Sequence, residues 1–134
     1  MTSPSKDDDS RDAPWHANIK LKRVYDPPDP EDGRRVLVTR YWPRGVHKSA
    51  TDEYHSTLAP SRELIAQYRK GGMSWKKFSQ RYRQELSGGQ LQSELRRLAD
   101  FARFRVLTLL CFCEEEQGCH RTLLRQAIID SVQD

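Results

Sequence analysis

The sequence predicts an α/β domain with a small, largely parallel sheet of three to four strands, flanked by about four helices in Rossmann-like layers. Two apolar runs, at residues 36–38 and 106–112, have the composition of strands that are covered on both faces. Between and after these runs, apolar residues recur at spacings of three and four, which is typical of amphipathic helices. The expected order of elements is therefore β-β-α-α-α-β-α.

The length and composition fit one domain with a charged surface. The chain has 134 residues, of which 36% are hydrophobic, enough for one compact core. No segment approaches the ~20 apolar residues of a membrane helix, so we expect no membrane partner. Three cysteines are an odd number and do not make a disulfide framework, which favours a cytoplasmic protein with reduced thiols.

Residues 1–17 are expected to be a disordered tail, and residues 18–134 a single domain. The tail is polar and charged, and Pro4 and Pro14 interrupt it, so it has little apolar surface to bury. Trp15 is a candidate to pack back onto the domain. The net charge is +4 and the tail holds more acids than bases, so the domain itself is cationic and favours acidic partners.

The first two strands are expected at residues 18–25 and 35–41. The first alternates apolar residues with lysines, as a half-buried strand does. The connection 26–33 is too short for a parallel crossover, so these strands are either antiparallel neighbours or not adjacent. Residues 46–58 have a mixed pattern that fits a short helix or an extended arm.

Three helices are expected before the last strand, and one after it. Ser61 and Ser74 precede periodic apolar segments and are typical N-caps. The glycine pairs 71–72 and 88–89 are expected to end the first two of these helices. The last helix, expected from about Cys119, carries its apolar stripe at Leu123, Leu124, Ala127, Ile128 and Val132.

Four segments together match the pattern of one known family. The longest, residues 35–45, contains the run Arg-Tyr-Trp-Pro-Arg-Gly, and the others are residues 58–61, 75–86 and 113–121. These segments resemble the YeaO-like proteins, a family named for a domain of unknown function (488), over roughly residues 18–131. The resemblance implies a compact α/β fold and supplies no established activity.

Two arginines flank the end of the second expected strand. Arg40 and Arg44 can each grip a phosphate or carboxylate with a bidentate guanidinium. Trp42, between them, can stack a base or cover such a site. In the alternative, Trp42 belongs to the core and both arginines pair with acids of the 26–32 connection.

The segment Cys119-His120-Arg121 breaks a local rule at the start of the last helix. Bases in a first helical turn are unfavourable unless an anion lies there, because the helix dipole is positive at that end. If the preceding strands are parallel neighbours, we expect Arg121 and the two arginines of the second strand to converge on one anion. The alternative is an internal ion-pair network with the glutamates at 114–116.

The cysteines allow two kinds of chemistry. Cys113 and Cys119 are candidate nucleophiles near a helix N-terminus, with His120 available for proton transfer. The Cys-x5-Arg loop of cysteine phosphatases is absent, and small buried thiols are the alternative. Cys111, with the other two cysteines and His120, would complete a Cys3His zinc site, but the spacing is strained. We therefore expect no metal and, since glycine-rich nucleotide loops are missing, no cofactor.

The expected function is the binding of an anionic ligand, such as a phosphorylated metabolite, a nucleotide or a nucleic-acid end, with Cys/His-assisted chemistry. The first alternative is a non-enzymatic nucleic-acid-binding module, and the second is a zinc-binding or redox-sensing protein. The nucleic-acid alternative draws on the basic side chains Arg62, Arg69, Lys70, Lys76, Lys77, Arg81, Arg83, Arg96 and Arg97. Both an enzyme and a binding module fit these residues, and no pattern indicates an oligomeric state.

Overall fold

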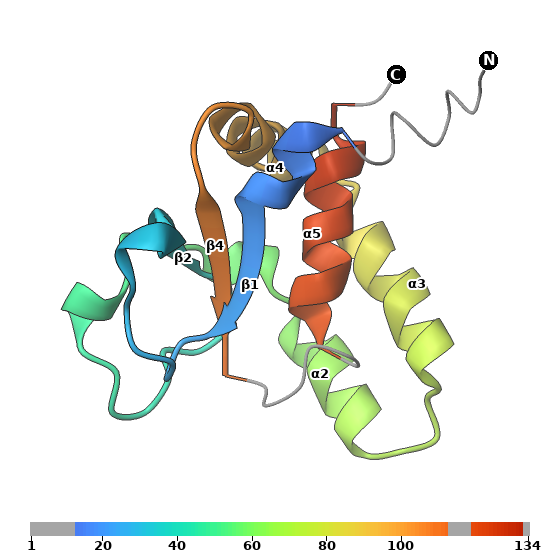
Figure 1. The fold of residues 1–134 in the computed structure, drawn as a ribbon. Helices are drawn as coiled ribbons and strands as arrows, with labels where there is room; N and C mark the ends of the chain where they lie inside the picture. Colours follow the sequence, from blue (N-terminus) through green and yellow to red (C-terminus); the bar gives the residue numbers. More distant parts are fainter. Residues whose placement is uncertain (1–12, 113–118, 133–134) are drawn as a thin grey trace.

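Four short parallel strands form the sheet of this computed structural model, which describes residues 13–112 and 119–132 (Figure 1). The strands are β1 (Ile19–Arg23), β2 (Arg34–Leu37), β3 (Glu53–Tyr54) and β4 (Leu107–Cys111). Their order is β1-β4-β2-β3, and every neighbouring pair is parallel. The expected small parallel sheet is confirmed, and β1 and β2 are indeed not adjacent, because β4 lies between them.

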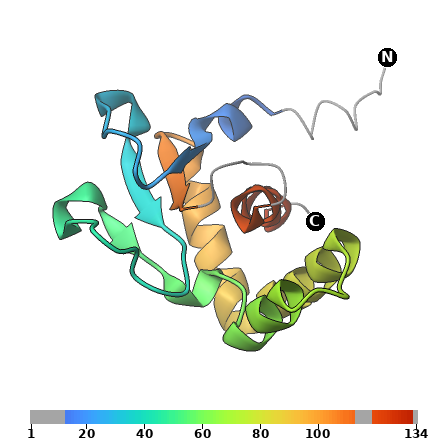
Figure 2. The same cartoon turned by 90° about the horizontal axis from the view of Figure 1, so that it is seen from below.

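β4 is central, and all five of its residues are buried. Leu109 lies in register with Leu21 of β1 on one side and Val36 of β2 on the other. Its apolar run forms a strand because helices cover one face of the sheet and connecting loops cover the other (Figure 2). On the loop face, the Thr108 hydroxyl donates to the backbone carbonyl of Asp32 at 2.7 Å.

The described residues form four α-helices: α2 (Arg62–Arg69), α3 (Trp75–Leu86), α4 (Gly89–Ala102) and α5 (His120–Asp130). The two expected serine caps are confirmed, since Ser61 Oγ accepts from the amide of Leu64 and Ser74 Oγ from that of Lys77. Gly71 has a φ of 86°, which suits the turn between α2 and α3. The glycine pair 88–89 does not end α3 with a left-handed turn, although this was expected. Gly88 is instead the N-cap of α4.

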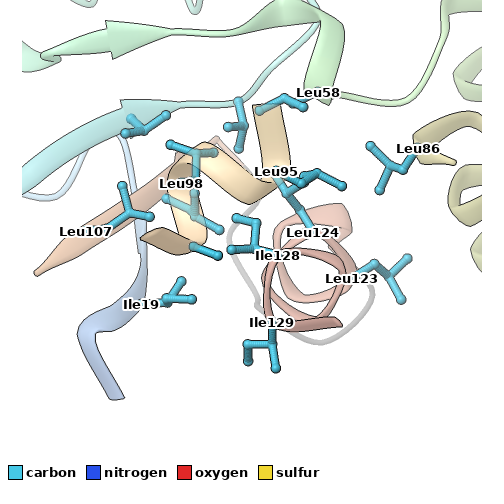
Figure 3. Packing of buried hydrophobic residues seen from close by; sticks show 14 of the residues in the cluster. Ile19, Leu58, Leu86, Leu95, Leu98, Leu107, Leu123, Leu124, Ile128 and Ile129 are labelled. Atoms are coloured by element: carbon cyan, nitrogen blue, oxygen red, sulfur yellow. The ribbon is translucent and has the colours of Figure 1, made fainter. Parts of the chain in front are cut away.

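The main core lies between the sheet and the helices. Ile19 and Leu107 of the sheet face Leu98 of α4 and Leu124 and Ile128 of α5 (Figure 3). The apolar stripes that predicted the helices are therefore the surfaces that cover the sheet. No helix of the described residues is long and apolar enough to cross a membrane.

Regular structure begins before residue 17, which was the expected end of the tail. A 3-10 helix, η1 (Pro14–Asn18), precedes β1, and His16 within it is buried. Trp15 packs against the main core, as the sequence analysis expected. The Asn18 side-chain amide donates to the Ala102 carbonyl at 2.7 Å, which fastens this entry to the end of α4. The remainder of the expected tail, residues 1–12, lies outside the described residues.

The segment 46–58 is mostly irregular, with β3 between two single 3-10 turns. These turns are η3 (Lys48–Ala50) and η4 (Ser56–Leu58). β3 is held from β2: the Asp52 amide donates to the Arg35 carbonyl, and the His55 amide donates to the Leu37 carbonyl. An edge strand of two residues that is fixed by its neighbour is too short to show an alternating pattern in its own sequence.

Candidate functional site

A pocket of about 130 Å³ opens at the carboxyl ends of β2 and β4, against α2 and α3. This is the edge of an open α/β sheet at which ligands usually bind. Five aromatic side chains contribute to its lining: Tyr41, Tyr68, Trp75, Phe78 and Phe112. Its polar groups come from Thr39, Arg40, Arg69, Cys111 and His120.

The aromatic wall is a packed unit that the turn between α2 and α3 creates. The Phe78 ring stacks on Trp75 with centroids 5.2 Å apart and lies 4.7 Å from the Tyr68 ring. Because the glycine pair at 71–72 reverses the chain, the ring from α2 meets the two rings from α3. The wall offers a flat apolar surface beside the polar groups at the strand ends.

Cys111 ends β4 and His120 begins α5, and their reactive atoms face each other. Cys111 Sγ lies 3.8 Å from His120 Nδ1, while His120 Nε2 lies 2.6 Å from the backbone oxygen of Val38. A carbonyl oxygen only accepts, so Nε2 must carry the hydrogen of this bond. In the neutral ring, Nδ1 is then the unprotonated nitrogen, and it is turned toward the thiol.

Cys119 completes a close group with these two residues. It is the N-cap of α5, and its Sγ lies 3.4 Å from Cys111 Sγ, with both side chains buried. The three potential ligand atoms of Cys111, Cys119 and His120 all lie within 4.8 Å of one another. Such a set can hold a metal ion, so the zinc alternative stays a prediction. Cys113, the other expected nucleophile and zinc ligand, lies outside the described residues.

Arg40, an expected ligand-binding residue, lies in the pocket wall and also supports it. Its Nε donates to the Pro60 carbonyl at 3.1 Å, and its Nη2 donates to the Ala59 carbonyl at 2.9 Å. Within the described residues, no hydrogen bond engages Nη1. The guanidinium is therefore positioned by backbone carbonyls, and it forms no ion pair with a carboxylate in the part of the chain that the structure describes.

The loop 58–61, one of the segments of the family pattern, is hydrogen-bonded to side chains of α3. The Glu85 carboxylate accepts from both the amide and the hydroxyl of Ser61, and Tyr82 donates its hydroxyl to the Leu58 carbonyl. Burial raises the pKa of Tyr82 well above its ordinary value, so this phenol remains a donor throughout the physiological range. These contacts explain why α3 and a distant loop share one family pattern.

Trp42 and Arg44, also expected to bind a ligand, lie outside the pocket. Trp42 is 39% exposed, donates its indole N–H to the Val46 carbonyl, and meets the ring of Tyr54 edge-on. Arg44 is exposed in the following turn, where its backbone carbonyl accepts from Tyr25. Trp42 therefore belongs neither to the core nor to the described pocket.

Arg121 is buried and turned toward β1, away from the pocket lining. It is 2% exposed, and its Nη1 donates to the Lys22 carbonyl at 2.9 Å. Its buried Nε makes no hydrogen bond to any part of the chain that the structure describes. The first turn of α5 thus sends His120 toward β2 and Arg121 toward β1. The expected sharing of one anion by Arg121 and the strand-two arginines stays a prediction.

A second group of charges lies between β3 and α4. Glu53 pairs with Arg34 and Arg97 and accepts from His55, while Glu94 also pairs with Arg97. Burial alone raises the pKa of Glu53, but the bonds from its basic partners outweigh burial and lower that pKa to about 2. Because its carboxylates are already paired with guanidinium groups, this group is better explained as an ion-pair network than as a metal site.

The basic residues of the nucleic-acid alternative lie on α2, α3 and α4, except Lys70, which is the C-cap of α2. All nine of these side chains are exposed. Exposure is required both of a nucleic-acid surface and of an ordinary solvated helix face, so this alternative also stays a prediction.

Cys111 and Arg69 are two pocket residues that the sequence analysis named only in its alternatives, Cys111 as a zinc ligand and Arg69 as part of a nucleic-acid surface. The alternation of side chains along β4 could have identified Cys111. Cys111 lies on the same face of the strand as Leu107 and Leu109, which meet the helices. Arg69 gave no such signal, because it is one of several arginines on helices and only the turn after α2 brings it to the pocket.

Comparison with known proteins places these features in a family. A family model described as "DUF488-N3a: Active DUF488-N3 subclade" matches residues 19–131. The uncharacterized protein YeaO of Escherichia coli (strain K12) is 39% identical over 109 residues, covering 80% of this chain and 93% of that protein. The uncharacterized protein Rv3073c of Mycobacterium tuberculosis (strain ATCC 25618 / H37Rv) is 38% identical over 82 residues, or 60% of this chain and 70% of that protein. No solved structure matches the chain significantly.

Proposed function

We propose, for a chain that belongs to the YeaO-like DUF488 family, that the pocket binds a small anionic ligand on which Cys111 acts as a nucleophile. His120 would serve as the general base of the thiol. The observation that carries this proposal is the approach of Cys111 Sγ to His120 Nδ1 within the lining of one pocket. A nucleophile, a base and a group that orients the base are the parts that covalent catalysis requires.

The proton path follows from the hydrogen bonds of His120. As the sulfur of Cys111 bonds to an electrophilic carbon of the ligand, Nδ1 takes the thiol proton. The Val38 carbonyl holds the Nε2 hydrogen, which fixes the ring and stabilises the imidazolium that forms. The same proton can then pass from Nδ1 to the leaving group, so the first half-reaction needs no further acid.

The lining favours a ligand with a flat apolar part and an anionic part. The rings of Tyr68, Trp75 and Phe78 can pack against the flat part, while Arg40 and Arg69 supply positive charge for a phosphate or carboxylate. A volume of about 130 Å³ lies below the ~300 Å³ at which pockets for drug-sized molecules begin, so the ligand is metabolite-sized.

Three simple probes test this ligand chemistry: phenyl phosphate, phenol and inorganic phosphate. Phenyl phosphate combines both parts, so it should raise the unfolding midpoint and slow iodoacetamide labelling of Cys111 more than the other two do. At a hundredfold excess over its Kd, binding stabilises the fold by about 2.7 kcal/mol.

Arg69→Ala should weaken phenyl phosphate binding about tenfold, the effect of losing one charge-assisted hydrogen bond. Lys70→Ala is the matched control, because Lys70 is the next residue, is also exposed, and does not line the pocket. Equal binding by both variants, or binding that leaves the labelling of Cys111 unchanged, would contradict the proposal.

A further inference from the structure

We infer that Cys111 and Cys119 form a reversible disulfide when a hydroperoxide enters the pocket, which makes the proposed nucleophile a site of redox modification. The inference rests on the proposed function in one respect, namely that the thiol of Cys111 is reactive. It adds a role for Cys119, which does not line the pocket and takes no part in the proton path.

The two sulfurs are already close and belong to the ends of two elements. Their separation is 3.4 Å, so forming a bond of ~2.05 Å requires an approach of roughly 1.4 Å. Cys119 is the N-cap of α5, with an extended backbone, and its side chain makes no capping hydrogen bond to that helix. Turning its sulfur toward Cys111 therefore removes no cap from α5.

The separations of the three side chains can be compared with those around a shared zinc ion. Two thiolates at ~2.3 Å from a tetrahedral zinc ion lie about 3.8 Å apart, and a thiolate and an imidazole nitrogen lie about 3.6 Å apart. In this structure the sulfurs are closer than that, at 3.4 Å, and Cys111 Sγ is farther from His120 Nδ1, at 3.8 Å. The 3.4 Å separation is that of a hydrogen bond in which the Cys119 thiol donates to Cys111 Sγ, and the test below includes a chelator to distinguish a zinc-bound pair from a pair of thiols.

The chemistry balances with the hydroperoxide as the oxidant. Cys111 transfers its proton to Nδ1 of His120, and its sulfur attacks the outer oxygen of the peroxide, which breaks the O–O bond. The products are a sulfenic acid on Cys111 and an alcohol that takes the proton from Nδ1. The sulfur of Cys119 then attacks the sulfenic sulfur and releases water. Two thiols have lost two electrons and two protons, and the peroxide has become an alcohol and water.

The geometry also sets the order of these steps. Cys111 lines the pocket and meets the oxidant first, whereas Cys119 is buried, does not line the pocket, and resolves the product. The disulfide removes the thiol of Cys111 from the pocket and ties the end of β4 to the start of α5. A dithiol reductant restores both thiols, so oxidation switches the proposed nucleophile off reversibly.

The test uses the full chain carrying Cys113→Ser. All three cysteines fall between Arg105 and Arg121 with no lysine or arginine between, so trypsin leaves them on one peptide. A glutamate-specific protease cuts at Glu114–Glu116 and separates Cys111 from Cys119. After brief treatment with hydrogen peroxide and blocking with iodoacetamide, we expect these two peptides to be joined, and to be released by dithiothreitol.

Cys119→Ser is the matched variant, in which Cys111 should accumulate sulfenic and then sulfinic acid instead of a cross-link. Sulfinic acid on Cys111 without a cross-link in the Cys113→Ser protein would overturn the inference. So would thiols that resist peroxide until a chelator removes bound zinc. Failure of phenyl phosphate to bind, with the cross-link still formed, would overturn only the proposed ligand.

Discussion

Cys111 Sγ and His120 Nδ1 lie 3.8 Å apart, although the two residues are nine positions apart in the chain. The parallel sheet produces this meeting, because α5 begins at the edge where β4 and β2 end. The Val38 carbonyl, one residue beyond β2, then fixes the histidine ring. Three segments of the chain thus supply the thiol, the imidazole and the carbonyl to which the proposed function gives the roles of nucleophile, base and orienting group.

Replacing Gly33 by alanine should destabilise the fold strongly. A Cβ at this position would lie 2.2 Å from the backbone oxygen of Val106, and φ is +62°. That oxygen also accepts from the Arg34 amide at the start of β2, so relief of the clash would disturb the sheet. We expect a loss of about 3 kcal/mol or more, a fall in the midpoint of roughly 10 °C, measured by thermal unfolding.

Gly45→Ala is the control for Gly33→Ala. Gly45 also has a positive φ, of +78°, but no atom lies within 4 Å of the added Cβ. Its cost should be limited to backbone strain, about 1 kcal/mol. Equal losses in the two variants would show that contact with Val106 is not what requires glycine at position 33.

Tyr82→Phe should destabilise the protein by about 1–3 kcal/mol, because it leaves the buried carbonyl of Leu58 without its donor. The matched control is Tyr68→Phe, since the Tyr68 hydroxyl makes no hydrogen bond to another described residue. Denaturant unfolding measures both effects. A loss in Tyr82→Phe no larger than in the control would mean that this bond does not hold the loop 58–61.

The stability of the protein should fall in acid, with Glu53 as one source. The pKa of Glu53 is about 2 in the fold, below its ordinary value of 4.5, so the folded state binds this proton less readily than the unfolded chain. Its contribution is therefore complete above pH 4.5 and is lost as the pH falls toward 2. We expect roughly 1–2 kcal/mol, since Arg34 and Arg97 are partly exposed to solvent.

Glu53→Gln should flatten this acid dependence, as measured by denaturant unfolding at several pH values between neutral and 3. Glu63→Gln serves as the control, because Glu63 is exposed and pairs with no base in the part of the chain that the structure describes. An unchanged acid slope in Glu53→Gln would mean that its ion pairs do not contribute to stability.

The parts of the fold that the sequence predicted are those whose signals are local. The apolar run of β4 and the serine caps at Ser61 and Ser74 can be recognised from adjacent residues alone. β3 could not be predicted, because two polar residues form a strand only when β2 offers its carbonyls and amides.

The pocket lies at the edge of the sheet where the sequence predicted a site, and its lining includes only some of the predicted residues. The sequence identifies the start of α5. It does not reveal that the side chain of Arg121 points toward β1 while that of His120 points toward β2. Cys111 was assigned to a strand and to the zinc alternative, since the sequence does not reveal that the strand ends at that residue. Side-chain direction depends on where an element stops, which is a tertiary property.

The rate of alkylation of Cys111 is the most direct test of the central claim that His120 activates this thiol. In a chain carrying Cys113→Ser and Cys119→Ser, iodoacetamide can react only with Cys111, and His120→Gln should slow this reaction by about tenfold or more at neutral pH. His47→Gln is the control, because His47 is exposed and does not line the pocket. Equal rates in the two histidine variants, or labelling of Cys111 only after unfolding, would contradict the account.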